Sequence, residues 1–373
     1  MNTFHPDFLG EVARRAGIQP QPQFRQFVVQ HIYEDTLRLL LTAHQFFPID
    51  VVIGIGYSGK PEVIEMLKAH GIQVLTPSFQ DLKAVVRDEL GKSLHHCAQT
   101  GRQLMIQEVG GYAIKAFHQH YRAYRQSIRG SVEITKQGVW TAQQIPDLLI
   151  PQLNCAETQL KEIEADFVGE AVVLALDVIL RELGYALAGR RALVTGYGWI
   201  GRGVCRGLQA KRMIVAGHDI DIIRKVALKL DGFLLLDELD SLEKVSLVVG
   251  ASGKRSITSQ LIDRLGNRTI LVSASSKDIE IDTDYLKSQA HQIEPVHPHV
   301  TAYHLKERIL YLVNQGFPVN FLGSSVQDEL VEFLLAEALI LLNQLALNDF
   351  SPGTFPLPPN LELIPAQVWL DLR

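Results

Sequence analysis

Three glycines in the segment 196–201, which reads GYGWIG, have the spacing of a dinucleotide-binding turn. An apolar run precedes the turn, a stretch of helix length follows it, and a second apolar run leads to Asp219. At this spacing Gly196 permits a tight turn, Gly198 lets the backbone approach a pyrophosphate, and Gly201 lets the helix pack closely on the strand. The first helical amides face the phosphates, and Asp219 accepts hydrogen bonds from a ribose diol. These parts, in this order, predict a dinucleotide cofactor.

The residues around this turn bear on which dinucleotide it takes. Asp219 disfavours a 2′-phosphate by charge repulsion, whereas Arg224 and Lys225 could accommodate one. We expect NAD, with NADP as the alternative. Trp199 and Ile200 lie inside the turn and are expected to contribute to the cofactor site.

A second glycine pattern spans residues 54–59, after the apolar residues 51–53 and before a helix that opens at Pro61. No acid follows the next apolar run, so the expected ribose contact is missing. The pattern is interpreted as a Rossmann-like turn of a separate substrate domain. Tyr57 and Lys60 at this turn are a candidate acid pair, although their spacing can also arise by chance.

A group of histidines, His297, His299 and His304, has strand spacing that could bring two imidazoles to one face. Pro298 interrupts the group, and we therefore predict no metal site.

The order of segments predicts the scaffold that positions these residues. Alternating apolar and helical runs predict an α/β fold with doubly wound parallel sheets. The Pro-rich segment 351–365 is expected to be irregular. We predict helices at 24–47, 165–183, 222–230 and 258–265, and strands at 51–53, 104–107, 148–150, 246–250 and 269–273.

Composition narrows the partners of this 373-residue chain. A net charge of −5 and a pI near 6.2 disfavour nucleic acid, so a small molecule or a protein is expected. The apolar stretch 330–345 contains Glu332 and Glu337, and it predicts a buried helix rather than a membrane span. Three widely spaced cysteines and an N-terminus without an apolar core predict a cytoplasmic protein.

Three further motifs accompany the glycine turn: RGSVEITKQGV at 129–139, KDIEID at 277–282 and PVNFLG at 318–323. Together they resemble the S-adenosylhomocysteine hydrolase family over residues 148–282, and more weakly over 54–357. This resemblance implies two Rossmann-like domains, with an NAD domain at 166–324 inserted in a substrate-like domain at 1–165 and 325–373. It also implies a connector helix, tightly held NAD, a homo-oligomer and a place in one-carbon metabolism.

Carried over residue by residue, the resemblance keeps the cofactor positions and alters the catalytic ones. Thr135 and Asn320 match residues that contact NAD in the family. The family's active-site His falls on Tyr57 and its catalytic Glu on Ile134, beside Glu133. The remaining candidate positions are a substrate-binding lysine at Lys161, one carboxylate of an Asp-Asn pair at Asp166 and one carboxylate of an acidic segment at Glu108.

The function expected from this pattern is NAD-dependent oxidation of a hydroxyl on a nucleoside-like small molecule, on a hydrolase scaffold with altered chemistry. Two alternatives stay open at this point. One is a catalytically inactive NAD-binding regulator, and the other is a divergent adenosylhomocysteinase. Whether the chain is an enzyme depends on how many proton-transfer groups survive.

Overall fold

The structure is a computed structural model that describes residues 7–275, 277–322 and 326–373. It divides into two compact units, each with its own core. Unit 1 comprises Met1–Glu162 and Asp328–Arg373, and unit 2 comprises Ile163–Gln327. The sequence predicts these boundaries at 165/166 and 324/325.

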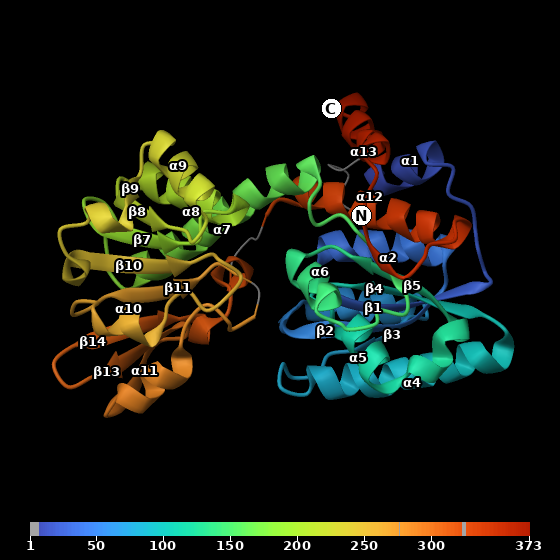
Figure 1. Ribbon diagram of the computed structural model, residues 1–373, viewed down its shortest axis with the longest axis horizontal. Helices are drawn as coiled ribbons and strands as arrows, with labels where there is room; N and C mark the ends of the chain where they lie inside the picture. The colour runs from blue at the N-terminus through green and yellow to red at the C-terminus, as the bar shows by residue number, and fades with distance from the viewer. Residues whose placement is uncertain (1–6, 276, 323–325) are drawn as a thin grey trace. The chain divides into compact units, whose positions relative to one another are not determined.

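A seven-stranded sheet with parallel strand pairs forms the centre of unit 1, in the order β15-β6-β5-β4-β1-β2-β3. Helices α2 and α12 lie on one side of it and α4 and α5 on the other (Figure 1). The strands are β1 (Phe24–Ile32), β2 (Ile49–Gly59), β3 (Gln73–Leu75), β4 (Gln103–Glu108), β5 (Ile128–Glu133), β6 (Pro151–Asn154) and β15 (Gly353–Pro356). The helices are α1 (Phe8–Arg15), α2 (Glu34–Phe46), α3 (Pro61–Ala69), α4 (Leu82–Thr100), α5 (Tyr112–His120), α6 (Lys136–Gln143), α12 (Asp328–Leu347) and α13 (Pro359–Asp371).

Unit 2 has an eight-stranded sheet in the order β12-β13-β14-β11-β10-β7-β8-β9. Its pairs are parallel except for β12-β13 and β13-β14, which are antiparallel. The strands are β7 (Arg191–Thr195), β8 (Ile214–His218), β9 (Leu234–Leu235), β10 (Val245–Gly250), β11 (Ile270–Ser273), β12 (Gln292–His297), β13 (Val300–His304) and β14 (Ile309–Val313). The helices are α8 (Trp199–Ala210), α9 (Ile222–Leu230), α10 (Ser259–Asp263) and α11 (Thr283–Gln289), and α7 (Gln159–Glu182) begins in unit 1 and continues into unit 2.

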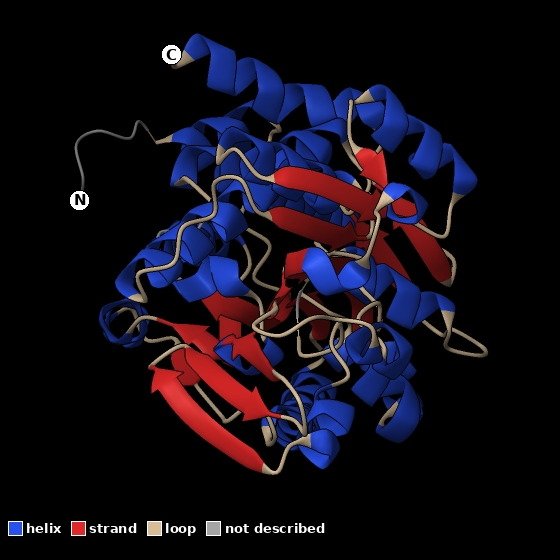
Figure 2. Ribbon diagram, turned by 90° about the vertical axis from the view of Figure 1, so that its left-hand side faces the viewer, coloured by secondary structure: helices blue, strands red, loops and turns tan. Residues whose placement is uncertain are grey.

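Both units therefore have the predicted α/β fold with Rossmann-like sheets. Strands and helices alternate along most of the chain. Figure 2 shows helices packed around the strands. The predicted elements from α7 to β11 are confirmed, with ends that differ by a few residues. The predicted strand at 148–150 is displaced to β6.

The predicted helix at 24–47 is wrong in its first half, where the structure has strand β1. Val28 and Val29 are adjacent in sequence and both fully buried, which requires both faces of the segment to be covered. Central parallel strands have this pattern because helices cover both of their faces. An apolar run of this length is ambiguous between helix and strand.

The second glycine pattern is not a turn, because residues 54–59 continue strand β2. Gln30 of β1 pairs with Gly54, and Ile32 pairs with Gly59, so β2 carries three extra residues in this interval. A bulge of this kind bends a strand and is frequent beside functional sites. Gly56 fits here because an added Cβ would lie 2.6 Å from the backbone oxygen of Pro77.

The C-terminal segment also differs from its prediction. Residues 351–365 were expected to be irregular, but they form β15 and the start of α13. Helix α12 is the one helix among the described residues long and apolar enough to cross a membrane. Since 72% of its apolar window is buried inside the structure, it is the buried helix that the sequence predicts.

Candidate functional site

The glycine turn of unit 2 joins β7 to α8 and has the geometry that a dinucleotide requires. Gly196 has a φ of 102°, in the region that favours glycine. An added Cβ at Gly201 would lie 1.9 Å from the Gly196 carbonyl oxygen, so no side chain fits there. Gly198 is the N-cap of α8 and, as a glycine, supplies no side-chain cap, so the N-terminus of the helix opens at the turn itself. These residues fit a pyrophosphate.

Asp219 follows β8 directly and faces this turn. Its two carboxylate oxygens accept hydrogen bonds from the backbone N–H of Tyr197 (2.7 Å) and of Asp221 (2.9 Å). The side chain is thereby fixed at the carboxyl end of β8, where a ribose diol binds in Rossmann folds. Arg224 lies over Gly198, since an added Cβ there would be 2.8 Å from its Nη1 atom.

Glu280, from the KDIEID motif, lies behind the turn. It is fully buried and accepts hydrogen bonds from the hydroxyls of Ser252, Ser256 and Ser275 and from the backbone N–H of Gly253. Burial raises its pKa. This carboxylate fastens the loops that follow β10 and β11, and thus has a structural role in unit 2.

Asn320 lies at the same edge of the sheet. It belongs to a short 3-10 helix (Val319–Leu322) and is 6% exposed. Pro318 pairs with Ser273 at the carboxyl end of β11, so Asn320 is held beside the strand ends that surround the glycine turn. Trp199 and Ile200 open α8 and are partly exposed.

Asp166 has a different environment from the one that the sequence predicts. Its carboxylate accepts hydrogen bonds from Arg202 (3.1 Å and 3.3 Å) and from Arg206 (3.0 Å), both on α8. These bonds tie α7 to α8 within unit 2. Lys161 is on the first turn of the same helix and belongs to unit 1, so the boundary between the units falls between these two candidate residues.

In unit 1, Glu108, Glu133 and Asn154 form a row at the carboxyl ends of β4, β5 and β6, because their Cα atoms are partners in the sheet register. Glu108 is fully buried and accepts from the backbone N–H of Ala113 (2.6 Å) and of Ile114 (3.0 Å). It therefore binds the free amides at the start of α5, the usual task of a helix cap.

Thr135, predicted to contact NAD, belongs to unit 1 and is the N-cap of α6. Its hydroxyl donates to Glu133 (2.7 Å) and accepts from the N–H groups of Gly110 (3.1 Å) and Gly138 (3.2 Å). A hydroxyl has one donor and two acceptor positions, and all three are used. A cofactor contact from Thr135 would have to use its methyl group or its backbone.

His31 is a residue that the sequence analysis missed. It lies near the carboxyl end of β1, just before α2, and its Nδ1 atom is hydrogen-bonded to the hydroxyl of Ser58 in the β2 bulge. Ser58 donates its proton to the carbonyl of Ile55 (3.1 Å), so its oxygen accepts from Nδ1–H. Nε2 is then the unprotonated nitrogen, and burial lowers the pKa of His31 to about 4.

This arrangement supplies an imidazole where the sequence analysis expected none. The resemblance assigned the active-site His position to Tyr57, whose side chain lies outside the described residues although its backbone is part of β2. Ser58, which contacts His31, is the next residue in the chain. The sequence signal for such a residue is a histidine between the end of a strand and the start of a helix. Because residues 24–47 were predicted as a single helix, His31 was not recognised as lying at a strand end.

Two of the three histidines considered as metal ligands each lie beside a glutamate. Nε2 of His297 lies 2.8 Å from Glu182, and Nε2 of His304 lies 3.3 Å from Glu294. Across the ranges that the structure describes, no three His, Cys, Asp or Glu side chains are grouped to hold a metal ion.

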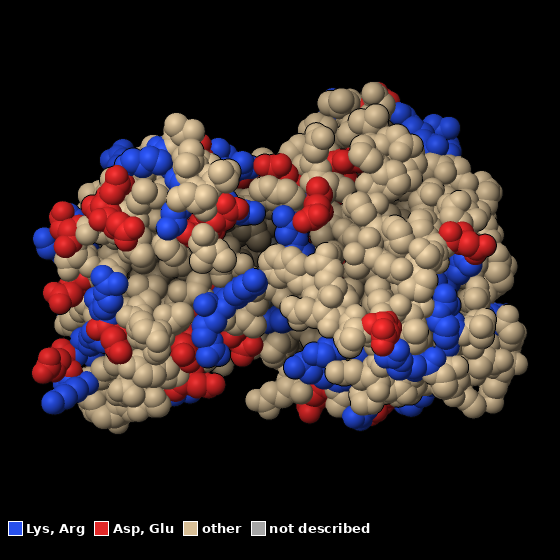
Figure 3. All heavy atoms as spheres, in the orientation of Figure 1, with Lys and Arg blue, Asp and Glu red and all other residues tan. Residues whose placement is uncertain are grey.

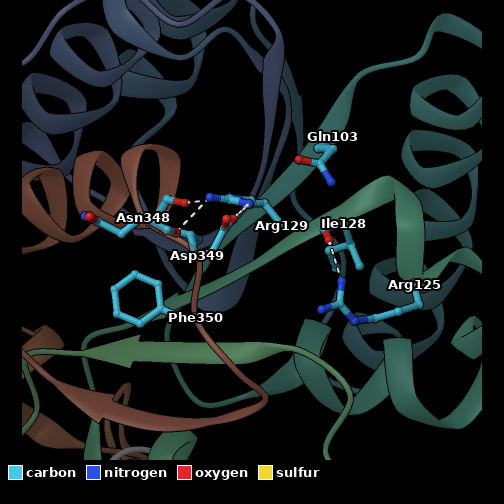
Figure 4. A pocket seen from close by; sticks show the side chains of 8 residues that line it. Gln103, Arg125, Ile128, Arg129, Asn348, Asp349 and Phe350 are labelled. Atoms are coloured by element: carbon cyan, nitrogen blue, oxygen red, sulfur yellow. Dashed lines mark hydrogen bonds and ion pairs between the residues drawn. The ribbon is translucent and has the colours of Figure 1, made fainter.

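A polar cavity of about 260 Å³ lies at the opposite edge of the unit 1 sheet, where β4 and β5 begin (Figure 4). Its Arg129 donates to the carbonyls of Leu345 (2.8 Å) and Asn348 (2.7 Å) and to the carboxylate of Asp349 (2.7 Å). This guanidinium therefore hydrogen-bonds backbone carbonyls at the C-terminal end of α12. Ligands of doubly wound sheets bind at the carboxyl ends of the strands, so this cavity is not part of the candidate site.

The fold and the glycine turn define an α/β protein of two units, one of which is a dinucleotide-binding domain. Comparison with known proteins specifies the domain further, because the family model described as "S-adenosyl-L-homocysteine hydrolase, NAD binding domain" matches residues 171–326. Residues 171–326 therefore resemble the NAD-binding domain of S-adenosylhomocysteine hydrolases, and the cofactor of this chain is NAD.

The relatives extend the similarity beyond this domain. An adenosylhomocysteinase of Thermotoga maritima is 26% identical over 91% of this chain and 85% of the relative. An adenosylhomocysteinase of Archaeoglobus fulgidus is 23% identical over 84% of this chain and 78% of the relative. An S-inosyl-L-homocysteine hydrolase of Methanopyrus kandleri is 26% identical over 72% of this chain and 65% of the relative.

Proposed function

We propose that this protein uses NAD to oxidise, and then reduce again, a ribose hydroxyl of a nucleoside thioether, and thereby cleaves the thioether. The substrate class follows the names of the relatives, which act on S-adenosyl- or S-inosyl-homocysteine by those names. The observation that carries the proposal is the turn at Gly196–Gly201 with Asp219 fixed beside it, in a chain that also has an imidazole at a strand end of unit 1.

Bound NAD⁺ supplies the acceptor for the hydride that leaves the carbinol carbon. The hydroxyl proton has to leave at the same time, so a base is required near the oxygen. His31 fits this role because its ring is neutral above about pH 4 and, with Nδ1–H bonded to Ser58, Nε2 is the basic nitrogen of the ring. Oxidation acidifies the hydrogen on the neighbouring ribose carbon, so that this proton is lost and the C–S bond breaks with the thiol as leaving group; water then adds to the resulting double bond. The cofactor held at the glycine turn would supply the hydride that restores the hydroxyl.

The remaining candidate groups have auxiliary tasks in this proposal. Lys161 is proposed to bind the substrate, and Tyr57 to act as an acid. Glu108 and Asp166 are engaged by backbone amides and by arginines respectively, and they support the neighbouring helices.

The test combines cofactor analysis with turnover. Protein purified without added nucleotide is denatured and its supernatant analysed for NAD(H), and native protein is incubated with S-adenosylhomocysteine or S-inosylhomocysteine while free thiol is measured. We expect bound NAD and thiol release from one of the two substrates. Absence of NAD binding on titration refutes the proposal. NAD with no thiol release from either substrate refutes the enzymatic part and favours the inactive regulator.

A substitution tests the role of His31. H31N removes the proton acceptor, and we expect kcat to fall by about 10²- to 10⁴-fold. The NAD content should not change, because His31 belongs to unit 1 and the glycine turn to unit 2. H70N, at an exposed histidine whose ring bonds the carbonyl of Met66, is the matched control and should leave kcat unaltered. A normal kcat in H31N contradicts the assignment.

A further inference from the structure

Glu133 is a fully buried carboxylate at the carboxyl end of β5 that the proposed reaction does not use directly. It lies between two connections, the turn after β4 that contains Gly110 and Gly111 and the segment after β5 that leads into α6. Both connections lie at the edge of the unit 1 sheet where a ligand is expected.

Five hydrogen bonds converge on this carboxylate. Four come from backbone N–H groups, and the fifth comes from the hydroxyl of Thr135. The donors are the N–H of Gly110 (3.1 Å), Gly111 (3.0 Å), Ile134 (3.0 Å) and Thr135 (2.7 Å) and the Thr135 hydroxyl (2.7 Å). Since two donors come from one connection and three from the other, a single side chain fixes both connections to each other.

The surrounding backbone is built to receive this carboxylate. Gly110 and Gly111 have φ values of 87° and 69°, which turn their N–H groups toward Glu133 in a conformation that favours glycine. Gly138 lets α6 approach, because an added Cβ there would lie 1.7 Å from Oε2 of Glu133. Three glycines thus accommodate one buried side chain.

Burial of a carboxylate is costly, and here it raises the pKa of Glu133 to about 7. Only the ionised form can accept from all five donors, whereas a protonated oxygen would face N–H groups. Four of the five donors bond Oε1, and the N–H of Gly111 bonds Oε2. A glutamine with its amide nitrogen in place of Oε2 would lose the Gly111 contact and set two N–H donors against each other. If Glu133 only filled space in the core, an apolar side chain would do so without the free-energy cost of burying a carboxylate.

We propose that Glu133 is a positioning residue which holds the 110–111 turn and the start of α6 together as one side of the nucleoside-binding edge of unit 1. It acts through Gly110, Gly111 and Thr135 and does not touch the reacting atoms. The inference rests on the proposed function, because the edge that it organises is the one assigned to the substrate.

The experiment measures loop order and nucleoside binding separately. In NAD-loaded E133Q, amide hydrogen exchange of residues 110–111 and 134–135 should accelerate by at least tenfold, and Kd for adenosine and inosine should rise by about 10- to 100-fold. E332Q is the control for loss of a buried carboxylate, since Glu332 pairs with Arg38 (2.7 Å) between α12 and α2. It should lose stability without either change.

A second pair of variants keeps the test informative if E133Q folds poorly. T135V removes the hydroxyl that donates to Glu133, and T135S keeps it. T135V should weaken nucleoside binding while T135S restores it to near the wild-type Kd. Unchanged exchange and Kd in E133Q, or equal Kd values for T135V and T135S, overturn the inference.

The outcomes also separate this inference from the proposed function. Wild-type protein that binds nucleoside with the predicted dependence on Glu133 but releases no thiol contradicts only the proposed reaction. Wild-type protein that binds neither nucleoside contradicts both.

Discussion

In each unit a single carboxylate accepts hydrogen bonds from two separate backbone segments, and in unit 2 this residue is Asp219. Its oxygens accept from two backbone N–H groups, one in the glycine turn and one at the start of the α9 segment. Each oxygen retains a further acceptor position for a ribose hydroxyl. One side chain therefore shapes the turn and recognises the sugar.

Removal of this carboxylate should weaken NAD binding. D219A loses the acceptors for the ribose and releases the N–H of Tyr197, so we expect Kd for NAD to rise by about 10- to 100-fold, as for loss of a charged hydrogen bond of about 1.5–3 kcal/mol. Isothermal titration of NAD-stripped protein measures this. D221A is the matched control, because Asp221 accepts from Ile223 N–H (2.8 Å) as the cap of α9. Equal affinities in D219A and wild type would refute the assignment.

The sequence predicts such residues only where the partners are close in the chain. Asp219 and the turn at 196–201 belong to one β-α-β unit, so their spacing is sufficient to predict the contact. His31 and Ser58 are brought together by strand pairing, and the five donors around Glu133 come from two connections. Those sites depend on which strands are neighbours, and no local spacing encodes that order.

At the scale of elements, helices α7 and α8 pack backbone against backbone. An added Cβ at Gly169 would lie 2.5 Å from the carbonyl oxygen of Ile200, and one at Gly203 would lie 2.2 Å from that of Asp166. The glycines bring the two helices close, and the ion pairs of Asp166 with Arg202 and Arg206 lie at the same contact. This packing holds the helix that presents the cofactor turn.

Substitution of Gly203 should separate these helices. G203A adds helix propensity of about 1 kcal/mol, but the methyl group meets backbone that cannot move aside, so we expect a net loss of about 1–3 kcal/mol and weaker NAD retention. Thermal denaturation with and without NAD measures both effects. In G207A the methyl group meets only the side chain of Val173 at 3.0 Å, and this variant should be close to neutral. Equal melting temperatures for the two variants would contradict the packing argument.

Element boundaries show the same limit of prediction from sequence. The helices and strands from α7 to β11, apart from the short β9, were predictable because turns and caps such as Asp221 separate them. Residues 24–47 were not, because no glycine or proline divides β1 from α2 and a single residue, Tyr33, lies between them. The C-terminal strand β15 was missed because it forms only by pairing with β6, far away in sequence.

At the scale of the whole molecule, the placement of acids governs how stability depends on pH. Charged side chains of both signs are interspersed over the face shown in Figure 3, where water screens them. Other acids of unit 1 are buried (Glu133, Glu337) or half-buried (Asp35). Loss of contact with water raises the pKa of Asp35 to about 6, of Glu133 to about 7 and of Glu337 to about 8. Each of these groups therefore keeps its proton to a higher pH in the folded chain than in the unfolded chain.

Glu337 should dominate this dependence. It is fully buried on α12, and its Oε2 atom lies 3.0 Å from the hydroxyl of Thr158, with Cys155, Lys161 and the carboxylate of Glu362 around it. Because its pKa is raised from 4.5, the folded state binds more protons than the unfolded state between about pH 4.5 and 8. The stability contributed by neutral Glu337 is complete below about pH 4.5 and is lost as the pH rises through about 8.

The free energy of unfolding of unit 1 should therefore fall between pH 5.5 and 8.5, and E337Q should flatten this slope. A neutral amide of the same shape avoids the cost of ionisation, on the order of 2–4 kcal/mol, so E337Q should gain on wild type as the pH rises. Urea denaturation at a series of pH values measures the difference. E329Q, on the same helix but partly exposed, should keep the wild-type slope. If E337Q and wild type lose stability in parallel up to pH 8.5, Glu337 ionises without cost and its burial does not control the pH response of this unit.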